Sequence, residues 1–397
     1  MTTRSTRTAG GRRRSRTLRT GLAGLTGLLA AGSLVACNSS TTGADVHYDP
    51  APAAQQLADV CPATLVVQLQ WQPQADMGGV FELLGDDYTV DTDKKSVTGT
   101  LVAGGKDTGI SLELRAGGPA IGFQSVASRM YVDDATHLGL VHGEQIITAS
   151  GSQKVVGVTP LLTHNPAIVM WDPAAHPGLT LKTLKDSDTT VVVSKEQIFP
   201  KWLVAKGMVK ESQLDPGYDG NPARFVADSK IAQQGYVTSE PYTYEHDTPS
   251  WNKPVGYGML ADVGFDPYAA NVSVRADKLA EMTPCLKKLV PIIQRAGADY
   301  ITSPGATNRR IVDVVAKDAG NSPYTLGEAE YAAATMKEKG LISNENGSVG
   351  TYDVARVAAF VADIAPIAAQ DGSGVDPKVD PATLFDPQFG DPSIAVE

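Results

Sequence analysis

The sequence has 397 residues, 42% of them hydrophobic, which allows two domains and excludes a wholly disordered chain. Its formal charge of −10 is unevenly distributed. Residues 1–36 contain seven Arg and no Lys, Asp or Glu, so the rest of the chain carries 27 Lys or Arg against 44 Asp or Glu. Proteins that bind a phosphate backbone draw much of their affinity from Lys and Arg. We therefore expect no nucleic-acid partner.

The N-terminal residues have the organisation of an export signal. Basic residues between Arg12 and Arg19 precede an apolar run over 21–36. This run is shorter than the roughly 20 residues that a membrane-spanning helix needs. It predicts a signal peptide over 1–36, with a short membrane anchor as the alternative. The export route, general or twin-arginine, is left open.

The apolar run ends in Leu34-Val35-Ala36-Cys37, which resembles a bacterial lipobox, where cleavage leaves a lipid-modified Cys as the first residue. Small polar residues follow, and they predict a flexible, lipid-attached tether over 37–62. No other stretch approaches 18 uninterrupted apolar residues. We therefore expect a soluble extracytoplasmic protein that a lipid on Cys37 anchors to the outer face of the cell membrane.

Two cysteines remain once Cys37 is assigned to the lipid, Cys61 and Cys285. An even number of cysteines in an oxidising compartment predicts that they form a disulfide. The alternative is two separate buried thiols, because the sequence alone does not show that they are close.

From about Thr64 short apolar strands alternate with helices, which favours an α/β fold with mostly parallel sheets flanked by helices. The predicted strands are Thr64–Gln70, Val97–Val102, Gly109–Leu114, His137–Val141, Val155–Leu162, Ala167–Trp171 and Thr189–Val193. The predicted helices of this part are 119–132, Phe199–Lys206 and Phe225–Gln234, and a hairpin turn is predicted at 104–107. From about Lys278 the pattern predicts helices over 278–296, 309–317, 326–339 and 353–369, before an extended end rich in Pro and Asp.

Motifs for catalysis and metal binding are missing from the sequence. It has no His-Glu-x-x-His, no Gly-x-Ser-x-Gly, no Cys-x-x-Cys and no Walker A motif. His137 and His142 are predicted on opposite faces of a strand and its exit, so we do not expect them to share a metal. We expect no catalytic residue, no metal and no cofactor. An extracytoplasmic hydrolase is kept as an alternative class.

Ligands of open α/β sheets bind beyond the carboxyl ends of the strands, where loops and helix N-termini present polar groups. Four segments at such ends are rich in groups that recognise small molecules: 71–76, 142–144, 194–197 and 240–244. The candidate ligand-binding residues are Trp71, Gln74, Asp76, Gly117, His142, Glu144, Asn165, Ser194, Lys195, Glu240 and Tyr242.

The aromatic residues of this set are candidates for stacking on a flat ligand. Glu144 and Glu240 are candidates for accepting hydrogen bonds from the N–H groups of that ligand. Each has a plainer alternative. Trp71 could pack between lobes, the carboxylates could be solvated or paired with bases, and Ser194 could cap the next helix. Tyr242 and Tyr244 alternate, so on a strand at most one of them would face a ligand.

Several segments, taken in their order along the chain, resemble one family. Leu69-Gln70-Trp71-Gln72-Pro73, followed by Gly79-Val80-Phe81, is similar to its first strand and its Trp-x-Pro loop. Gly117-Gly118-Pro119, followed by His137-Leu138-Gly139-Leu140, is similar to its Gly-Gly turn and the next strand. Val155–Pro166 with 181–185 and Thr190–Val193 resembles its crossing into a second lobe. Phe225–Gln234, Gly235-Tyr236-Val237 and Glu240-Pro241 resemble its helix and strand that end in Glu-Pro.

The family is that of the substrate-binding lipoproteins of bacterial ABC importers, in the type II periplasmic-binding superfamily. The branch that the segments resemble includes binders of thiamine pyrimidine precursors, nitrate, sulfonates and riboflavin. The resemblance covers about residues 64–295. It departs from the family at Met77, where the family has a His, and at Asp86–Gly109, which is a longer insertion.

The resemblance implies a two-lobed α/β fold with two crossover hinge strands. Lobe 1 would comprise 63–150 and 262–397, the latter with a helical C-terminal extension, and lobe 2 would comprise 151–261. Cys61 and Cys285 would then belong to one lobe. The resemblance also implies a monomer that captures a small organic molecule between its lobes and delivers it to an ABC permease. The alternative function is a sensor or scaffold lipoprotein of the same fold that binds a protein partner.

Overall fold

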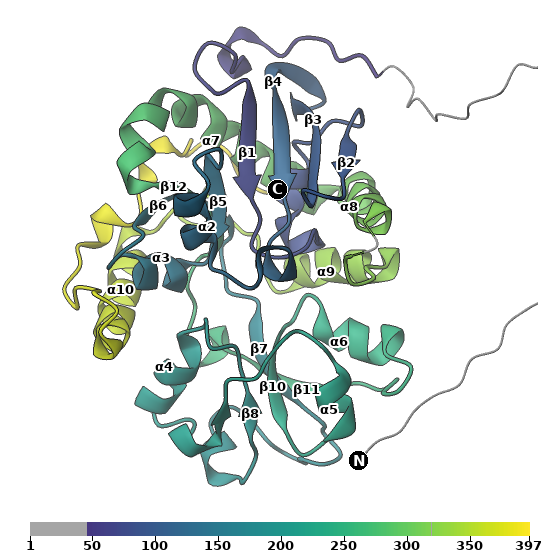
Figure 1. Ribbon diagram of the computed structural model, residues 1–397, viewed down its shortest axis with the longest axis vertical. Helices are drawn as coiled ribbons and strands as arrows, with labels where there is room; N and C mark the ends of the chain where they lie inside the picture. The colour runs from purple at the N-terminus through teal and green to yellow at the C-terminus, as the bar shows by residue number, and fades with distance from the viewer. Residues whose placement is uncertain (1–45, 319) are drawn as a thin grey trace, which may run out of the picture. The chain divides into compact units, whose positions relative to one another are not determined.

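The computed structural model describes residues 46–318 and 320–397. The predicted signal peptide, Cys37 and the first part of the tether lie outside the described residues. The described chain contains a seven-stranded sheet of order β2-β3-β4-β1-β5-β12-β6 and a five-stranded sheet of order β11-β7-β10-β8-β9 (Figure 1). None of the described helices is both long and apolar enough to cross a membrane.

The seven-stranded sheet has a parallel centre and antiparallel edges. Its strands are β1 (Thr64–Gln68), β2 (Thr89–Asp91), β3 (Ser96–Ala103), β4 (Lys106–Arg115), β5 (Leu138–Val141), β6 (Val155–Leu162) and β12 (Ala269–Arg275). β1 runs parallel to both β4 and β5, so that Val67 pairs with Leu114 on one side and Leu138 on the other. Every residue of β5 and β6 is buried, as expected for strands with both faces covered.

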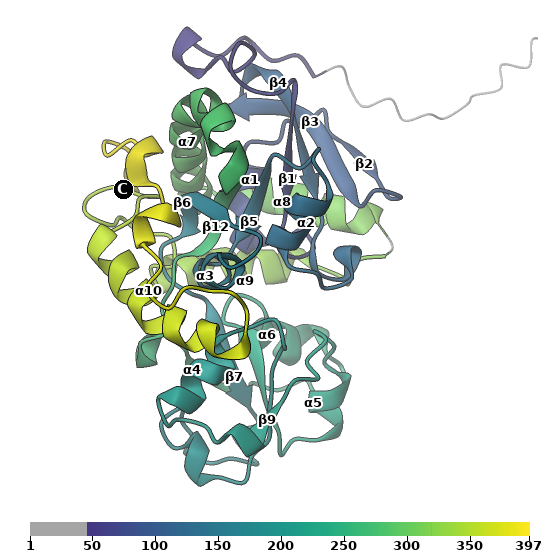
Figure 2. The same cartoon turned by 60° about the vertical axis from the view of Figure 1, so that its left-hand side comes forward.

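Helices cover this sheet. They are α1 (Gly78–Phe81), α2 (Val126–Val132), α3 (Gly143–Ala149), α7 (Leu279–Thr302), α8 (Gly305–Lys317), α9 (Leu326–Glu338) and α10 (Val354–Ala368). α7 packs on β6 and β12, and α2 packs on β1, β5 and β12. α10 contacts α3 of this sheet and also α4, a helix of the second sheet (Figure 2).

The five-stranded sheet lies in the teal part of the chain in Figure 1. Its strands are β7 (Ala167–Trp171), β8 (Val191–Val192), β9 (Leu214–Asp215), β10 (Ala232–Tyr236) and β11 (Gly256–Met259), with the helices α4 (Phe199–Ala205), α5 (Ala223–Ala227) and α6 (Glu240–Tyr242). β8, β9 and β10 are parallel to one another, whereas β7 is antiparallel to β10 and β11. The carboxyl ends of β8, β9 and β10 therefore lie at one edge of the sheet.

Two chain segments, 163–166 and 260–268, connect the two sheets, and they are bonded to each other. Asp266 in the second segment lies 2.7 Å from the Nδ1 atom of His164 in the first. Arg356 of α10 donates a hydrogen bond of 2.9 Å to Asp266 and one of 2.8 Å to a backbone carbonyl of the first segment. One guanidinium group therefore joins both connections to α10.

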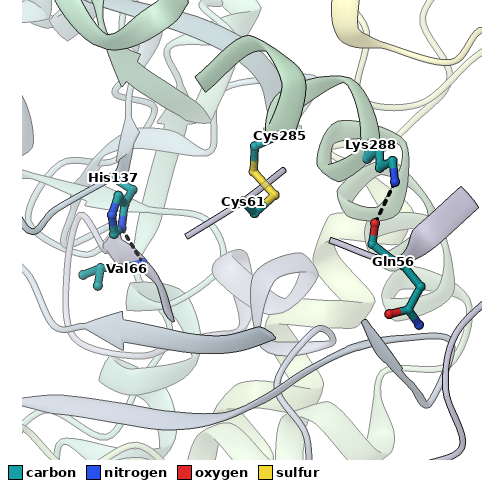
Figure 3. The surroundings of a disulfide bond; sticks show 6 residues. All are labelled: Gln56, Cys61, Val66, His137, Cys285 and Lys288. Carbon is teal, nitrogen blue, oxygen red and sulfur yellow. Dashed lines mark hydrogen bonds between the residues drawn. A yellow bond between two sulfur atoms is a disulfide. The ribbon is translucent and has the colours of Figure 1, made fainter. Parts of the chain in front are cut away.

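Cys61 and Cys285 form a disulfide with a Cα–Cα distance of 4.7 Å, which confirms the predicted pairing (Figure 3). Cys285 is fully buried in α7, which belongs to the seven-stranded sheet. Nearby, Lys288 of the same helix donates a hydrogen bond of 2.9 Å to the carbonyl oxygen of Gln56. The segment before β1 is thus attached to α7 by one covalent and one hydrogen bond.

Two of the helices predicted from the sequence have the wrong bounds. The stretch 119–132 is broken, because Gly122 and Phe123 have φ of +63° and +59°, and α2 starts only after Ser125, which caps it. The stretch Phe225–Gln234 is a helix only to Ala227. Its last residues belong to β10, where pairing with β7 and β8 overrides the helical preference of two consecutive Gln residues.

Candidate functional site

Polar residues follow the carboxyl ends of parallel strands in both sheets. Trp71 and Asp76 come after β1, and Glu144 comes after β5 in the seven-stranded sheet. Glu240 comes after β10 in the five-stranded sheet. Such strand ends are the usual place for a ligand in α/β proteins.

Tyr236, the last residue of β10, lies where these groups meet. Burial and the charges of Glu144, Glu240 and Asp76 all raise the pKa of its hydroxyl. Its ring also stacks on His142, with ring centroids 6.5 Å apart and an interplanar angle of 20°. The loops after β1 and β5 therefore approach the end of β10 across the boundary between the two sheets.

Asp76 and Glu144 are carboxyl groups buried almost completely, with 4% and 2% of their surface exposed. Burial raises the pKa of Asp76 to about 6 and that of Glu144 to about 7. The Gln74 side chain and the backbone N–H groups of Asp76 and Met77 partly oppose the rise in the pKa of Asp76. Asp76 Oδ1 and Glu144 Oε2, however, have no hydrogen-bond partner among the described residues. A buried acceptor without a partner is costly, and it is usually explained by an absent ion, water or ligand.

Glu240 is bonded within its own sheet. Its carboxylate accepts hydrogen bonds from the backbone N–H of Tyr236 at 2.7 Å and from the hydroxyl of Tyr218 at 3.2 Å. Burial raises the pKa of Glu240 to about 7. The carboxyl group is therefore fixed beside Tyr236 by two donors that carry no charge.

Glu328 of α9, a helix of the seven-stranded sheet, is hydrogen-bonded to the segment that follows β10 of the five-stranded sheet. It is buried, and its Oε1 atom accepts hydrogen bonds from Ser239 at 2.7 Å and from Thr243 at 3.1 Å. Burial raises its pKa to about 7. Helix α9 of the seven-stranded sheet is thereby bonded to the segment that follows β10.

Trp71 packs between loops of the two sheets. A Cβ atom on Gly118 would lie 2.4 Å from its indole, and one on Gly220 would lie 3.1 Å from it. Gly117 allows this arrangement, because a Cβ atom there would lie 2.2 Å from the backbone oxygen of Leu69. The Gly117 N–H donates a hydrogen bond of 2.9 Å to the Trp71 carbonyl. Gly117 is thus required where the chain approaches the backbone of Leu69, and Gly118 is required where it approaches the indole of Trp71.

The structure does not bring all the predicted residues to this place. Lys195 is exposed, and the Ser194 hydroxyl accepts a hydrogen bond of 3.2 Å from the Glu196 N–H, a local turn contact. Asn165 lies in the connection between β6 and β7, where its side chain accepts a hydrogen bond of 2.8 Å from the Ala167 N–H. These three residues shape loops and connections, and among the described residues none of them has a hydrogen bond to Tyr236, Asp76, Glu144 or Glu240.

Tyr242 and Tyr244 are helical, so the alternation predicted for a strand is wrong at these residues. The ring of Tyr242 contacts those of His246 and of Tyr331 of α9 in tilted arrangements, with ring centroids 4.5 Å and 5.5 Å apart. Tyr244 is buried against Phe225, at 5.1 Å, in the core of the second sheet. One ring therefore contacts α9 and the other packs in the interior.

His142 acts as a neutral group. Burial lowers the pKa of its imidazole to about 4, so the ring carries no charge at neutral pH. Its Nδ1 atom accepts a hydrogen bond of 3.3 Å from the Ala270 N–H. Within residues 46–318 and 320–397, no three His, Cys, Asp or Glu side chains are grouped to hold a metal ion.

Sequence reasoning missed Tyr236, Tyr218 and Glu328 as parts of this site. Tyr236 ends a strand, and a correct start for β10 would have placed it beside the candidate Glu240. Tyr218 follows the two-residue strand β9, which is too short for a periodic signal. Glu328 is in a helix about 90 residues away from Ser239 in the sequence, and only the tertiary fold joins them.

Comparisons with known proteins concern the fold. The sequence matches no protein-family model and no curated protein. A solved protein from Bordetella bronchiseptica is similar with a TM-score of 0.53 at 14% identity, over 83% of this chain and 96% of that one. The periplasmic nitrate-binding protein from Synechocystis has a TM-score of 0.49 at 11% identity, over 82% of this chain and 87% of that one. The alkanesulfonate-binding protein from Xanthomonas axonopodis pv. citri has a TM-score of 0.48 at 13% identity, over 77% of this chain and 93% of that one.

The predicted fold class is confirmed: the described chain has two α/β sheets flanked by helices, and the likeness to the Bordetella bronchiseptica protein extends over most of both chains. At these identities the likeness extends to the fold alone, and fold does not determine a ligand.

Proposed function

We propose that the protein is an extracytoplasmic receptor that captures a small organic solute between its two sheets and delivers it to an ABC-type importer. The observation that carries this proposal is the meeting of Asp76, Glu144 and Glu240 around Tyr236. These groups come from the strand ends of both sheets, and two of the carboxyl oxygens have no partner. A ligand that bonds to both sides stabilises the conformation in which the sheets are close.

In this receptor the described residues bind and orient the solute, and none is assigned to catalysis. Glu144 and Asp76 would accept hydrogen bonds on the side of the seven-stranded sheet, and Tyr236 and Glu240 would complete the site from the other sheet. The permease would then recognise the ligand-bound arrangement of the two lobes. We propose that the receptor acts as a monomer.

The first test is thermal unfolding of the purified protein against a panel of solutes: pyrimidines, flavins, nitrate, sulfonates, amino acids, amines and sugars. A ligand at a hundred times its Kd adds about 2.7 kcal/mol to the stability of the protein. We expect one chemically coherent class to raise the Tm by a few degrees. A cooperative transition that no solute shifts would contradict the receptor and favour a protein partner.

We also propose that Cys37 carries a lipid that keeps the receptor beside its permease. The sequence before Cys37 supports this, since a basic segment and an apolar run lead into the lipobox-like tetrapeptide. Cys37→Ala is expected to abolish acylation and to move the protein out of the membrane fraction, measured by labelling with a fatty-acid analogue and by fractionation. Undiminished acylation of the variant would contradict the assignment.

A further inference from the structure

The three carboxyl groups at the boundary between the sheets share one electrostatic property. Asp76, Glu144 and Glu240 act together on Tyr236, and the charge of Asp76 also acts on Glu240. No Lys or Arg of the described chain is among the groups that act on the pKa of Asp76 or Glu144. The nearest imidazole, His142, is uncharged at neutral pH. The site is therefore a concentration of carboxyl groups with raised pKa values and without a compensating cation.

The polar groups without a partner at this place are two carboxyl oxygens, which accept when ionised, and one hydroxyl, which can donate or accept. Asp76 Oδ1, Glu144 Oε2 and the hydroxyl oxygen of Thr238 have no partner among the described residues, and each of the three side chains is more than nine-tenths buried. Thr238 is two residues from Tyr236 and two from Glu240, so its hydroxyl belongs to the same loop. A nitrate or sulfonate group offers only acceptors and a negative charge, and it would satisfy none of the carboxylates.

Aromatic rings border the carboxyl groups. Tyr236 stacks on His142, and Tyr218 donates its hydroxyl hydrogen bond to Glu240. The loop that carries Tyr218 also carries Gly220, which lies against the indole of Trp71. Faces of Tyr and Trp rings attract a cation that is removed from water. The aromatic rings and the carboxylates therefore both favour a positively charged ligand.

We propose that the solute is an organic cation with at least one N–H on its positively charged group, such as an amine, amidine or guanidine, and that Asp76 and Glu144 accept its hydrogen bonds. The inference rests on the proposed receptor function and names the chemical class of its ligand. Charge-assisted N–H to carboxylate bonds would use both unpartnered oxygens and neutralise the local charge.

The test compares probes of one shape and different charge by isothermal titration calorimetry. Benzamidine is a cation, benzamide is its neutral counterpart, and benzoate is an anion of similar size; agmatine, taurine and nitrate extend the set. We expect benzamidine or agmatine to bind saturably and every neutral or anionic probe to bind at least tenfold more weakly. Glu144→Gln and Asp76→Asn should each weaken binding of the cation about tenfold or more. The control Glu281→Gln, on the exposed start of α7, should bind as the parent protein does.

The outcomes separate the two proposals. Binding of benzamide, benzoate, taurine or nitrate as tight as that of the cations would overturn the ligand class and leave the receptor standing. A cation affinity that neither Glu144→Gln nor Asp76→Asn changes would also overturn it. If no probe and no member of the solute panel binds, both the receptor and the ligand class are contradicted.

Discussion

Replacing Cys61 and Cys285 together by Ala is expected to lower the free energy of unfolding by about 5 kcal/mol, according to the loop-entropy relation for a disulfide. The two cysteines are separated by 224 residues, so the bond closes a long loop and removes many conformations from the unfolded chain. Urea unfolding of the oxidised parent and of the double variant, followed by circular dichroism, measures the difference.

The single variant Cys61→Ala is the control for this prediction. Because it also removes the bond, we expect it to lose nearly as much stability as the double variant. Reduction of the parent with a strong thiol should reproduce the loss, and reduction should leave the double variant unchanged. A loss below about 1 kcal/mol would mean that the unfolded chain gains little freedom when the bond is absent.

Glu144→Gln is expected to stabilise the ligand-free protein at pH 8 by up to roughly 3 kcal/mol. Burial raises the pKa of Glu144 from an ordinary 4.5 to about 7. Between these two values the folded state keeps the proton and the unfolded state releases it, so stability falls as the pH rises. A Gln side chain has no proton to lose and avoids this penalty.

Urea unfolding at pH 4 and at pH 8 tests the sign of this effect. Parent and variant should be similar at pH 4, where Glu144 is protonated in both states, and should diverge as the pH passes from 4.5 to 7. The exposed control Glu281→Gln should follow the parent at both pH values. If Glu144→Gln is less stable than the parent at pH 8, the carboxylate has a stabilising partner that the proposed site does not include.

Stability gained by removing a binding group would be consistent with a functional site. Residues that serve a ligand are often unfavourable for the folded protein without it, because their polar atoms are buried before the ligand arrives. Asp76 should behave in the same way over a lower pH range, since its pKa rises only to about 6.

Much of the fold could be predicted because the strands carry a local signal. β6 and β7 have the predicted bounds, Val155–Leu162 and Ala167–Trp171, since both are short, mostly apolar segments that contain β-branched residues. The predicted hairpin is formed by β3 and β4, and Gly104 and Gly105 supply the positive φ of its turn. The four helices after Lys278 are also confirmed, although α7 continues to Thr302.

The candidate site was predicted only in part, and the reason is physical. Asp76 and Glu144 follow well-defined strands, so the rule that ligands bind at strand ends finds them. Tyr236 and Glu328 matter through contacts with distant segments, which no local pattern encodes. The rule also selected Lys195, which is exposed, because it identifies a loop without saying which of its side chains face inward.

The cluster of Arg356, Asp266 and His164 has a mechanical consequence. Both connections between the sheets are bonded to each other and to α10 at one place, so they cannot shift independently without breaking charge-assisted bonds. We expect the second sheet to turn as a unit about an axis close to Arg356. The end of β10 around Tyr236 would then move with the second sheet. Because it lies away from the rotation axis, a small rotation near Arg356 would produce a larger displacement of the groups that contact the solute.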